Sequence, residues 1–270
     1  MTPAARISAA IEVLEDLIQR RRPAADALKD WGLSRRFAGS KDRAAIASLV
    51  YDALRRKASS AHVMGSDTPR ALMLGMLARQ RGLDLEQIAA LFTGEHHAPA
   101  PLESEEVDRL VALSLADAPD WERADVPEWL WPGYASAFGP DAVAEGQALA
   151  GRAPIDIRAN RLKTTRDRLA GELGHATPEP GAWSPDALRF QPGIDGRGPS
   201  LQAEPSFFAG GFEIQDEGSQ LVTLLAGAKP GQTVIDLCAG AGGKTLALAA
   251  LMDNRGRLFA TDLDARRLAP

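Results

Sequence analysis

The sequence of 270 residues predicts a multidomain protein: an all-α N-terminal domain, a small α+β domain and the start of a parallel α/β domain. Apolar residues recur at helical spacing through the first part of the chain. Alternation of apolar and polar residues, which is typical of a half-buried strand, begins after Pro154. An apolar run that breaks into glycines follows near the end of the sequence. We therefore expect domains at residues 1–125, 126–211 and 212–270, and we expect the last of them to be incomplete.

Apolar residues at helical spacing predict three helices at the start of the N-terminal domain. An apolar stripe from Ile7 to Ile18 predicts the first helix. Pro23 separates this helix from a second one that ends near Leu28, and residues 44–54 form a third helix with one apolar face. Several short amphipathic helices joined by tight turns predict a compact helical domain.

Two further helices carry start signals. Thr68 is an N-cap residue, and the proline that follows it occupies the first helical position. Asp84 and Gln87 have the spacing of a capping box, which predicts a helix from Leu85 to Phe92.

A tryptophan-rich stretch follows a helix that we expect around residues 107–115. Trp121, Trp129 and Trp131 lie close together in the sequence, near two prolines. Aromatic side chains at this density could stack on RNA bases, but we favour an apolar joint between two domains.

The second domain is predicted from a change of pattern. Residues 155–158 alternate as a half-buried strand does, and residues 187–190 form a second strand. Between them, Thr165 caps a helix that runs through Leu173. Residues 151–170 contain six Lys and Arg against two Asp, which makes this segment basic.

The third domain follows the order of a parallel α/β unit. We expect a strand, a helix, a second strand, a glycine-rich loop, a second helix and a third strand, in that order. The strands are predicted at Phe212–Ile214, Thr233–Leu237 and Arg257–Ala260, and the helices at Gln215–Ala226 and Leu246–Met252.

The glycine-rich loop is compatible with three ligands. The phosphate loop of an NTPase fits the run Gly243-Lys244-Thr245, but Cys238 occupies the position of its first glycine. A dinucleotide fold fits Gly240 and Gly242, but the third glycine would fall on Thr245. Both matches are partial.

The third interpretation is a site for S-adenosylmethionine (SAM). Small residues let the backbone approach the methionyl part and the ribose, and an acid after the next strand accepts hydrogen bonds from the ribose hydroxyls. Asp262 lies 26 residues after Asp236, as this layout requires. Asp262 could instead be a surface turn residue, since Asp264 follows it, but its place after an apolar strand favours the ligand role.

Composition narrows the class of protein. The apolar content of 45% and the charged content of 25% are ordinary for a globular protein, and we expect a cytoplasmic one without a membrane span or a signal peptide. One cysteine excludes an internal disulfide and a cysteine-rich zinc site. His96 and His97 lack metal-ligand spacing and predict a polar loop, so no metal is expected.

Charge is distributed unevenly along the chain. Residues 1–60 contain 12 Lys and Arg against 7 Asp and Glu, a net charge of +5, whereas the whole chain has −5. The remaining residues must therefore carry −10. From charge alone we favour a solvated helix face for the basic segment, and a surface that contacts phosphates is the alternative.

Three motifs resemble those of a known family. Residues 236–245, DLCAGAGGKT, are similar to the SAM-binding motif of RsmB/Sun-type RNA (cytosine-5) methyltransferases, commonly DLCAAPGGKT. Gly240 and Ala241 replace Ala-Pro, a change that keeps the residues small. Residues 212–220 resemble the upstream element VQDEASQ of that family, and residues 160–164 resemble its N-x-LKT segment. The N-terminal domain is similar in size and pattern to the NusB-like RNA-binding domain of the family.

The resemblance implies a Rossmann-like methyltransferase domain and a chemistry. In the family, a cysteine thiolate adds to C6 of cytosine, C5 takes the methyl group from SAM, and a second cysteine assists release. Both cysteines belong to later motifs, which this sequence does not reach. Cys238 matches the cysteine of the SAM loop, so we expect no catalytic residue in this chain.

The resemblance also implies which residues line SAM. They are Cys238, Ala239, Gly240, Ala241, Gly242, Gly243, Lys244 and Asp262. Asp236 is expected to fix the loop by accepting backbone N–H bonds, and Lys244 could instead be a solvated helix-start residue. Gln215, Asp216 and Ser219 either brace the loop or the RNA path, or cap their helix at Asp216.

Two hypotheses of different class follow. The first is an RNA cytosine-C5 methyltransferase, with rRNA as the expected partner and SAM as the cofactor, of which this chain is a part that is inactive alone. The alternative is a non-catalytic RNA-binding module with a vestigial SAM-domain stub.

Overall fold

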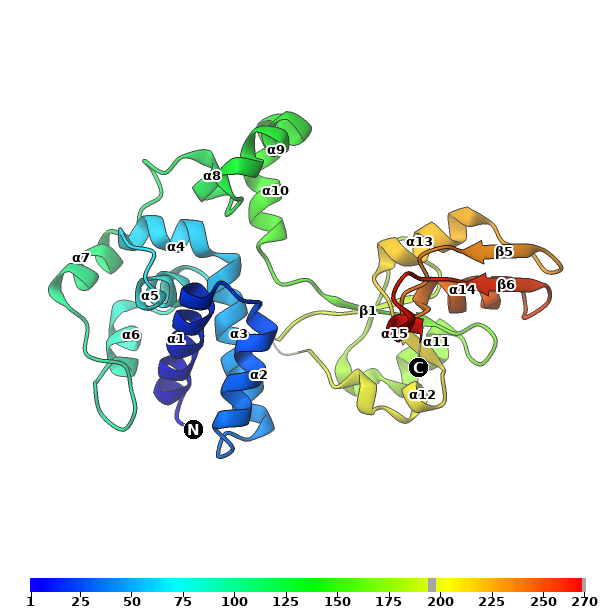
Figure 1. The fold of residues 1–270 in the computed structure, drawn as a ribbon, viewed down its shortest axis with the longest axis horizontal. Coiled ribbons are helices and arrows are strands. Elements are labelled where there is room, and N and C mark those ends of the chain that lie inside the picture. The colour runs from blue at the N-terminus through cyan, green and yellow to red at the C-terminus, as the bar shows by residue number, and fades with distance from the viewer. Residues whose placement is uncertain (194–197, 269–270) are drawn as a thin grey trace. The chain divides into compact units, whose positions relative to one another are not determined.

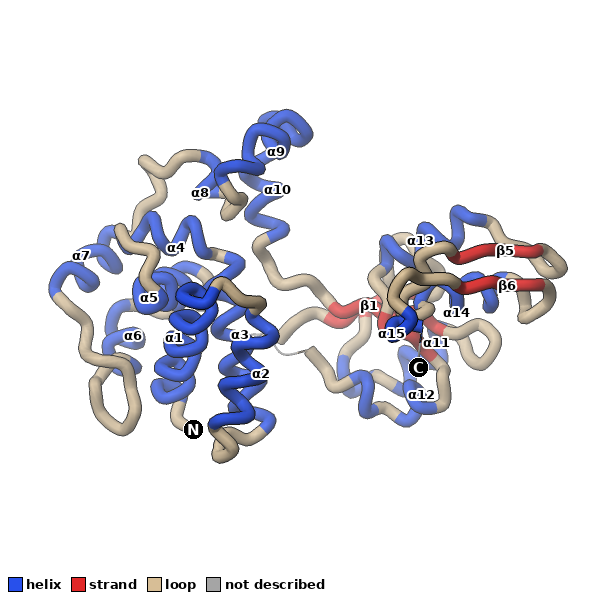
Figure 2. The backbone as a smooth tube through the Cα atoms, viewed as in Figure 1, coloured by secondary structure: helices blue, strands red, loops and turns tan. Residues whose placement is uncertain are grey.

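The computed structural model describes residues 1–193 and 198–268 of the chain. It divides into two compact units, Met1–Arg152 and Ala153–Pro270 (Figure 1). In the described residues, the first unit is helical and every strand lies in the second unit (Figure 2). No described helix combines the length and the apolar character that crossing a membrane requires.

The first unit consists of ten α-helices and two short 3-10 turns. The helices are α1 (Pro3–Arg20), α2 (Ala24–Ser34), α3 (Ser40–Arg55), α4 (Lys57–Met64), α5 (Pro69–Arg79), α6 (Leu85–Leu91), α7 (Ser104–Ala112), α8 (Asp120–Arg123), α9 (Trp131–Phe138) and α10 (Ala142–Leu149).

The start signals of these helices behave as predicted. The Thr68 side chain accepts a hydrogen bond from the Ala71 N–H, and Pro69 is the first residue of α5. At α6, Asp84 and Gln87 form both bonds of the capping box. Each cap satisfies N–H groups that the helix itself leaves without a partner.

The core of the first unit lies between α1, α3, α4 and α5. Leu14, Val50 and Leu74 are fully buried there. Helices α4 and α5 approach so closely that a Cβ atom on Gly75 would lie 2.8 Å from the Ser60 Cα. The core therefore requires glycine at this position, because any side chain would push the two helices apart.

The sequence missed or shortened several helices. Helix α2 continues to Ser34 instead of ending near Leu28, because Trp31 is buried on α1 and donates to Glu12. Helix α4 was not predicted, since its buried face contains Ser59 and Ser60 in place of apolar residues. Helices α9 and α10 were also missed.

The second unit begins with a four-stranded antiparallel sheet in the order β2-β3-β1-β4. Its strands are β1 (Ile155–Ala159), β2 (Glu179–Pro180), β3 (Ala187–Phe190) and β4 (Phe212–Ile214). Strand β1 is central: Ile157 lies opposite Leu188 of β3 on one side and Ile214 of β4 on the other.

One face of this sheet is covered. Helix α11 (Arg166–Glu172), the turn helix α12 (Pro205–Phe208) and the sheet enclose Ile157, Leu169, Phe190 and Phe212, all at most 1% exposed. Thr165 caps α11 as predicted, by accepting from the Arg168 N–H. A closed apolar core therefore holds this part of the unit.

The unit ends with two parallel strands, β5 (Thr233–Asp236) and β6 (Arg257–Ala260), which pair in register. Helices α13 (Glu217–Ala226) and α14 (Gly243–Leu251) pack on each other, and a short helix α15 (Ala265–Leu268) follows. The mixed α and β composition agrees with the expected start of an α/β domain. The three-domain division at residues 125 and 211 stays a prediction, as does the NusB-like character of the helical part.

Candidate cofactor site

The candidate site is the loop that joins β5 to α14. Gly240 and Gly242 have φ angles of 56° and 86°, in the left-handed region that residues with a Cβ rarely adopt. Gly242 is the N-cap residue of α14, and no side chain caps this helix. The glycines therefore let the chain turn sharply from the strand into the helix and leave the backbone N–H groups at the helix start uncovered.

The loop is tied to the segment that follows β6. The Thr261 N–H donates to the Asp236 carbonyl oxygen, and the Ala239 N–H donates to the Thr261 carbonyl oxygen, both at 2.9 Å. The Thr261 hydroxyl also donates to the Leu237 carbonyl at 2.9 Å. These bonds continue the β5–β6 pairing beyond the strands and fix the base of the loop.

Asp262 lies directly against the glycine loop. Its Oδ2 accepts from the Gly240 N–H and its Oδ1 from the Asp264 N–H, each at 2.9 Å. The bonds from Asp264 and Gly240, with a smaller contribution from Arg267, lower the pKa of Asp262 below its usual value of 3.8. Asp262 is therefore ionised at neutral pH, and each oxygen keeps a lone pair for a further donor.

Asp236 holds the helix start through a different partner from the one expected. Its Oδ2 accepts from the Thr245 hydroxyl at 2.7 Å, whereas we predicted backbone N–H groups as donors. The motif contains Thr245, but the sequence did not indicate it as the partner of Asp236. Since Thr245 lies in the first turn of α14, this bond joins the end of β5 to the helix across the loop.

The segment before α13 lies beside the loop. The Lys244 Nζ is 3.5 Å from the Ser219 Oγ, and a Cβ atom on Gly243 would lie 3.7 Å from the Gln215 Nε2. Asp216 caps α13 by accepting from the Ser219 N–H at 3.2 Å. Asp216 therefore caps α13. Gln215 and Ser219 lie next to Gly243 and Lys244 of the loop, where they could brace it.

A buried polar network joins this segment to the four-stranded sheet. Asp156 of β1 accepts from Arg189 of β3 at 2.7 and 2.8 Å, and from the Glu217 N–H at 3.0 Å. The Gln215 Oε1 accepts from the Arg158 Nε at 2.7 Å. Each bond links residues at least 33 positions apart, so the sequence carries no local signal for them.

The carboxylates of this network stay charged. Burial alone would raise the pKa of Asp156, but the bonds from Arg189 and from the Glu217 N–H outweigh it and lower the pKa below 3.8. Burial likewise opposes ionisation of Glu217, and the N–H groups of Ser184 and Trp183 outweigh it. The start of α13 is therefore anchored by charge-assisted hydrogen bonds.

The eight predicted ligand residues come together at this loop, and their exposure differs. Ala239 and Gly240 are buried, whereas Cys238, Ala241 and Lys244 are exposed. Small residues, free N–H groups at the start of a nine-residue helix and an ionised carboxylate fit a ligand with an anionic group and vicinal hydroxyls. These are the groups that SAM carries.

The remaining predictions concern the cysteine, a metal and the tryptophans. Cys238 is a free, exposed thiol of the loop. The described residues contain no group of three His, Cys, Asp or Glu side chains that could hold a metal ion. Trp121, Trp129 and Trp131 all belong to the first unit, and Trp129 is 81% exposed.

Comparison with known proteins shows what this chain is similar to. Residues 222–270 match the family model of the 16S rRNA methyltransferase RsmB/F. A probable ribosomal RNA small subunit methyltransferase B of Synechocystis is 31% identical over 150 residues, which cover 54% of this chain and 33% of that protein. The 26S rRNA (cytosine-C(5))-methyltransferase nsun-1 of Caenorhabditis elegans is 38% identical over 117 residues, 42% of this chain and 17% of that protein.

The fold has a solved counterpart. The crystal structure of PH0851 matches with a TM-score of 0.62 at 21% identity, over 99% of this chain and 65% of that one. The loop, the strand pair and the match of residues 222–270 agree with part of a methyltransferase fold. The chain is similar to RsmB/Sun-type methyltransferases, as its motifs indicated, and it spans a third or less of the length of these two curated relatives.

Proposed function

We propose that this chain provides the SAM-binding loop of a methyltransferase that acts on cytosine C5 of RNA, with rRNA as the substrate class. The observation that carries the proposal is the bond between Asp262 and the Gly240 N–H, which brings the acid after β6 against the glycine loop. Two rRNA methyltransferases among its relatives, one of them a cytosine-C5 enzyme, support the reaction and the substrate.

In this proposal the loop binds SAM along its whole length. The N–H groups of Gly243 and Lys244 at the start of α14 receive the carboxylate of the methionyl part. The glycine and alanine residues at 239–242 allow close backbone approach, and Asp262 accepts from the ribose hydroxyls. When bound, SAM supplies an electrophilic methyl group.

Cys238 has no nucleophilic role in the proposal. It lies within the loop, between Leu237 and Ala239, whose backbone groups bond to Thr261. A nucleophile must reach the base, whereas a residue of this loop lies along the cofactor. We therefore assign no catalytic residue to the chain, and RNA binding to its helical unit.

The interpretation as an NTPase is disfavoured by the lysine. In a phosphate loop the lysine reaches the terminal phosphates of the nucleotide. Here the Lys244 Nζ lies 3.5 Å from Ser219 of α13. In addition, Cys238 replaces the glycine that a phosphate loop needs at the strand end.

Calorimetric titration of the chain with SAM tests the proposal. Asp262→Asn removes the charge that the ribose hydroxyls meet while retaining an oxygen for Gly240, so we expect affinity to fall about 10-fold or more. Asp264→Asn is the matched control: its side chain pairs with Arg266, and we expect less than a twofold change. Equal SAM affinity in the Asp262 variant and the unmodified chain would contradict the proposed site.

A further inference from the structure

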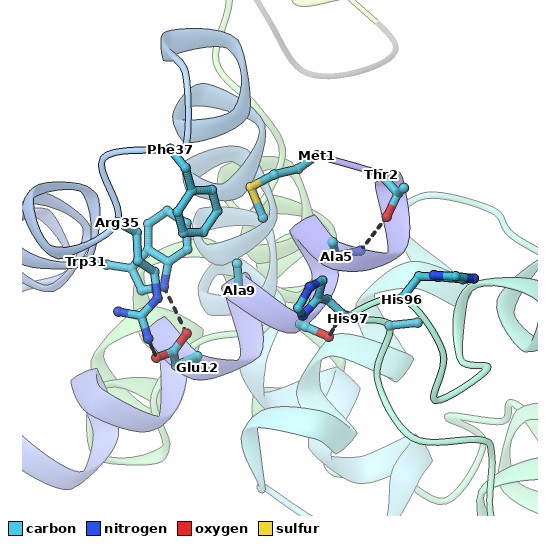
Figure 3. Close-up of a pocket in the computed structure, with 12 residues that line it drawn as sticks. Met1, Thr2, Ala5, Ala9, Glu12, Trp31, Arg35, Phe37, His96 and His97 are labelled. Carbon is cyan, nitrogen blue, oxygen red and sulfur yellow. Dashed lines mark hydrogen bonds and ion pairs between the residues drawn. The ribbon is translucent and has the colours of Figure 1, made fainter.

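The helical unit contains a cavity of about 690 Å³, within the range of small-ligand sites. The N-terminal half of α1 forms its floor, and two loops form its walls: residues 35–39 between α2 and α3, and residues 95–99 after α6. Figure 3 shows Phe37 and Trp31 on one side of the cavity and His97 on the other.

The two aromatic residues differ in exposure. Trp31 is 7% exposed; its indole N–H donates to Glu12 at 3.0 Å, and the Arg35 guanidinium lies 5.5 Å from the ring centroid. Phe37 is 74% exposed and lines the same cavity. Trp31 is therefore fixed by its neighbours, whereas the Phe37 ring remains open to a planar partner.

The loop that carries Phe37 is anchored on both sides. Ala38 is 1% exposed, and its N–H donates to the Arg35 carbonyl at 3.0 Å. The Arg43 Nε donates to the Ala38 carbonyl at 2.9 Å. The backbone next to Phe37 is thus held in place before any ligand arrives, which lowers the ordering cost of binding.

The opposite loop is held in an unfavourable conformation. His96 and His97 have φ angles of 49° and 69°, two successive residues in the left-handed region. The Ser8 hydroxyl of α1 donates to the His97 carbonyl at 2.8 Å and ties the loop to the cavity floor. Strain of this kind collects at ligand-binding segments.

The charge around the aromatic residues is positive. Residues 35–43 contain four Lys and Arg against one Asp. Arg35 pairs with Glu12, whereas Arg36, next to Phe37, is exposed and forms no ion pair with any described residue. An exposed aromatic ring beside an unpaired arginine is the combination that binds single-stranded nucleic acid through base stacking and phosphate contact.

We propose that this cavity receives one unstacked base of single-stranded RNA, which stacks on Phe37 while Arg36 contacts an adjacent phosphate. The inference builds on the proposed function, because it names the site on the helical unit at which the RNA partner binds. Bases inside a duplex are stacked on both faces, so the cavity selects single strands.

Fluorescence anisotropy of the full chain with a short fluorescein-labelled single-stranded RNA of mixed sequence tests the proposal. Phe37→Ala should weaken binding about 5-fold or more, the loss of one base–aromatic stack, and Phe37→Trp should restore it. Phe37→Leu separates stacking from apolar contact and should behave as the alanine variant. Leu33→Ala, another exposed apolar side chain on the preceding helix, is the matched control.

Arg36→Gln tests the phosphate contact separately. A plot of log affinity against log salt concentration has a negative slope, and in this variant the slope should become less negative by about 0.7, the value for one phosphate contact on a single strand. A blunt duplex of the same sequence should bind the unmodified chain more weakly than the single strand.

The inference is overturned if the chain does not bind the single strand, or if Phe37→Ala and Phe37→Leu bind within twofold of the unmodified chain. It is also overturned if the leucine variant binds as tightly as the tryptophan variant, since the contact is then apolar. SAM titration of the same variants separates the two proposals. Phe37→Ala should keep full SAM affinity and lose only RNA affinity. If the unmodified chain binds RNA but not SAM, the proposed cofactor loop is contradicted and the RNA site is not.

Discussion

The second unit contains two sheets that hold their apolar residues differently. In the four-stranded sheet, Phe190 and Phe212 are both 1% exposed under helices α11 and α12. In the parallel pair, Ile235 of β5 and Phe259 of β6 lie opposite each other, yet they are 64% and 52% exposed. The same residue types are therefore buried in one sheet and open to solvent in the other.

The difference shows what holds the candidate cofactor loop. Two strands with an open face gain little from apolar burial, so burial cannot fix the loop. Its shape rests instead on hydrogen bonds: Gly240 to Asp262, Thr245 to Asp236, and the bonds of Thr261. A binding site can thus be ordered by local polar contacts where the sheet beneath it is not covered.

Two phenylalanine truncations test the comparison most strongly. Phe212→Ala removes a ring from the closed core and should lower the free energy of unfolding of this unit by about 3–5 kcal/mol. Phe259→Ala removes a half-exposed ring and should cost about 1 kcal/mol or less. Hydrogen exchange of peptides from β1 and β5 measures both; equal protection losses would show that the two sheets are covered alike.

The buried charge network should produce a slightly smaller effect. Asp156→Asn removes the closer of the two carboxylates that pair with Arg189, the other being Glu217 at 3.3 Å, and should destabilise the unit by about 3 kcal/mol. The folded-state pKa of Asp156 is lowered, so its stabilisation is present above pH 3.8 and is lost as the pH falls through the folded pKa.

The pH dependence gives a second measurement on the same variant. Urea midpoints of the unmodified chain should fall steeply below pH 3.8, and those of Asp156→Asn should fall less. The pKa of Glu217 is also lowered, so part of the pH dependence of the urea midpoint remains in the Asp156→Asn variant. Parallel curves for the two proteins would mean that Asp156 is not ion-paired in solution.

The sequence predicted the fold best where the signal is local. Strands β4 and β6 were predicted with their observed ends, because their apolar runs are bounded by glycine or polar residues. The predicted helix at Gln215 starts two residues later in the structure, since the Gln215 N–H pairs with the Asp156 carbonyl. Helix α4 was missed because small serines replace apolar residues where it meets α5.

The sequence indicated which residues form the candidate site, but not all of the hydrogen bonds between them. The glycine motif and the spacing of Asp262 indicated which residues would meet, and the structure brings Asp262 to Gly240. The hydroxyl of Thr245 as the partner of Asp236 depends on how the helix turns after the loop, which composition does not encode. The assignment of these residues to SAM remains a prediction.

Thr245→Val tests the contribution of polar contacts to the open sheet. Valine keeps the shape of threonine but removes the donor to Asp236, so we expect a loss of about 1–2 kcal/mol in local stability. Thr245→Ser retains the hydroxyl and is the control. Hydrogen exchange at the start of α14 should rise only in the valine variant; unchanged protection would show that the loop is ordered by other contacts.

The smallest effect concerns the outer face of α13. Leu225 is 87% exposed, so Leu225→Ser has almost no burial to lose and should change the free energy of unfolding by less than about 0.5 kcal/mol. Chemical unfolding and sedimentation velocity should both be unchanged. A loss above about 1 kcal/mol, together with a lower sedimentation coefficient, would mean that another molecule covers this face in solution. In that case the contrast between the closed and the open sheet would describe the isolated chain and not the form that exists in solution.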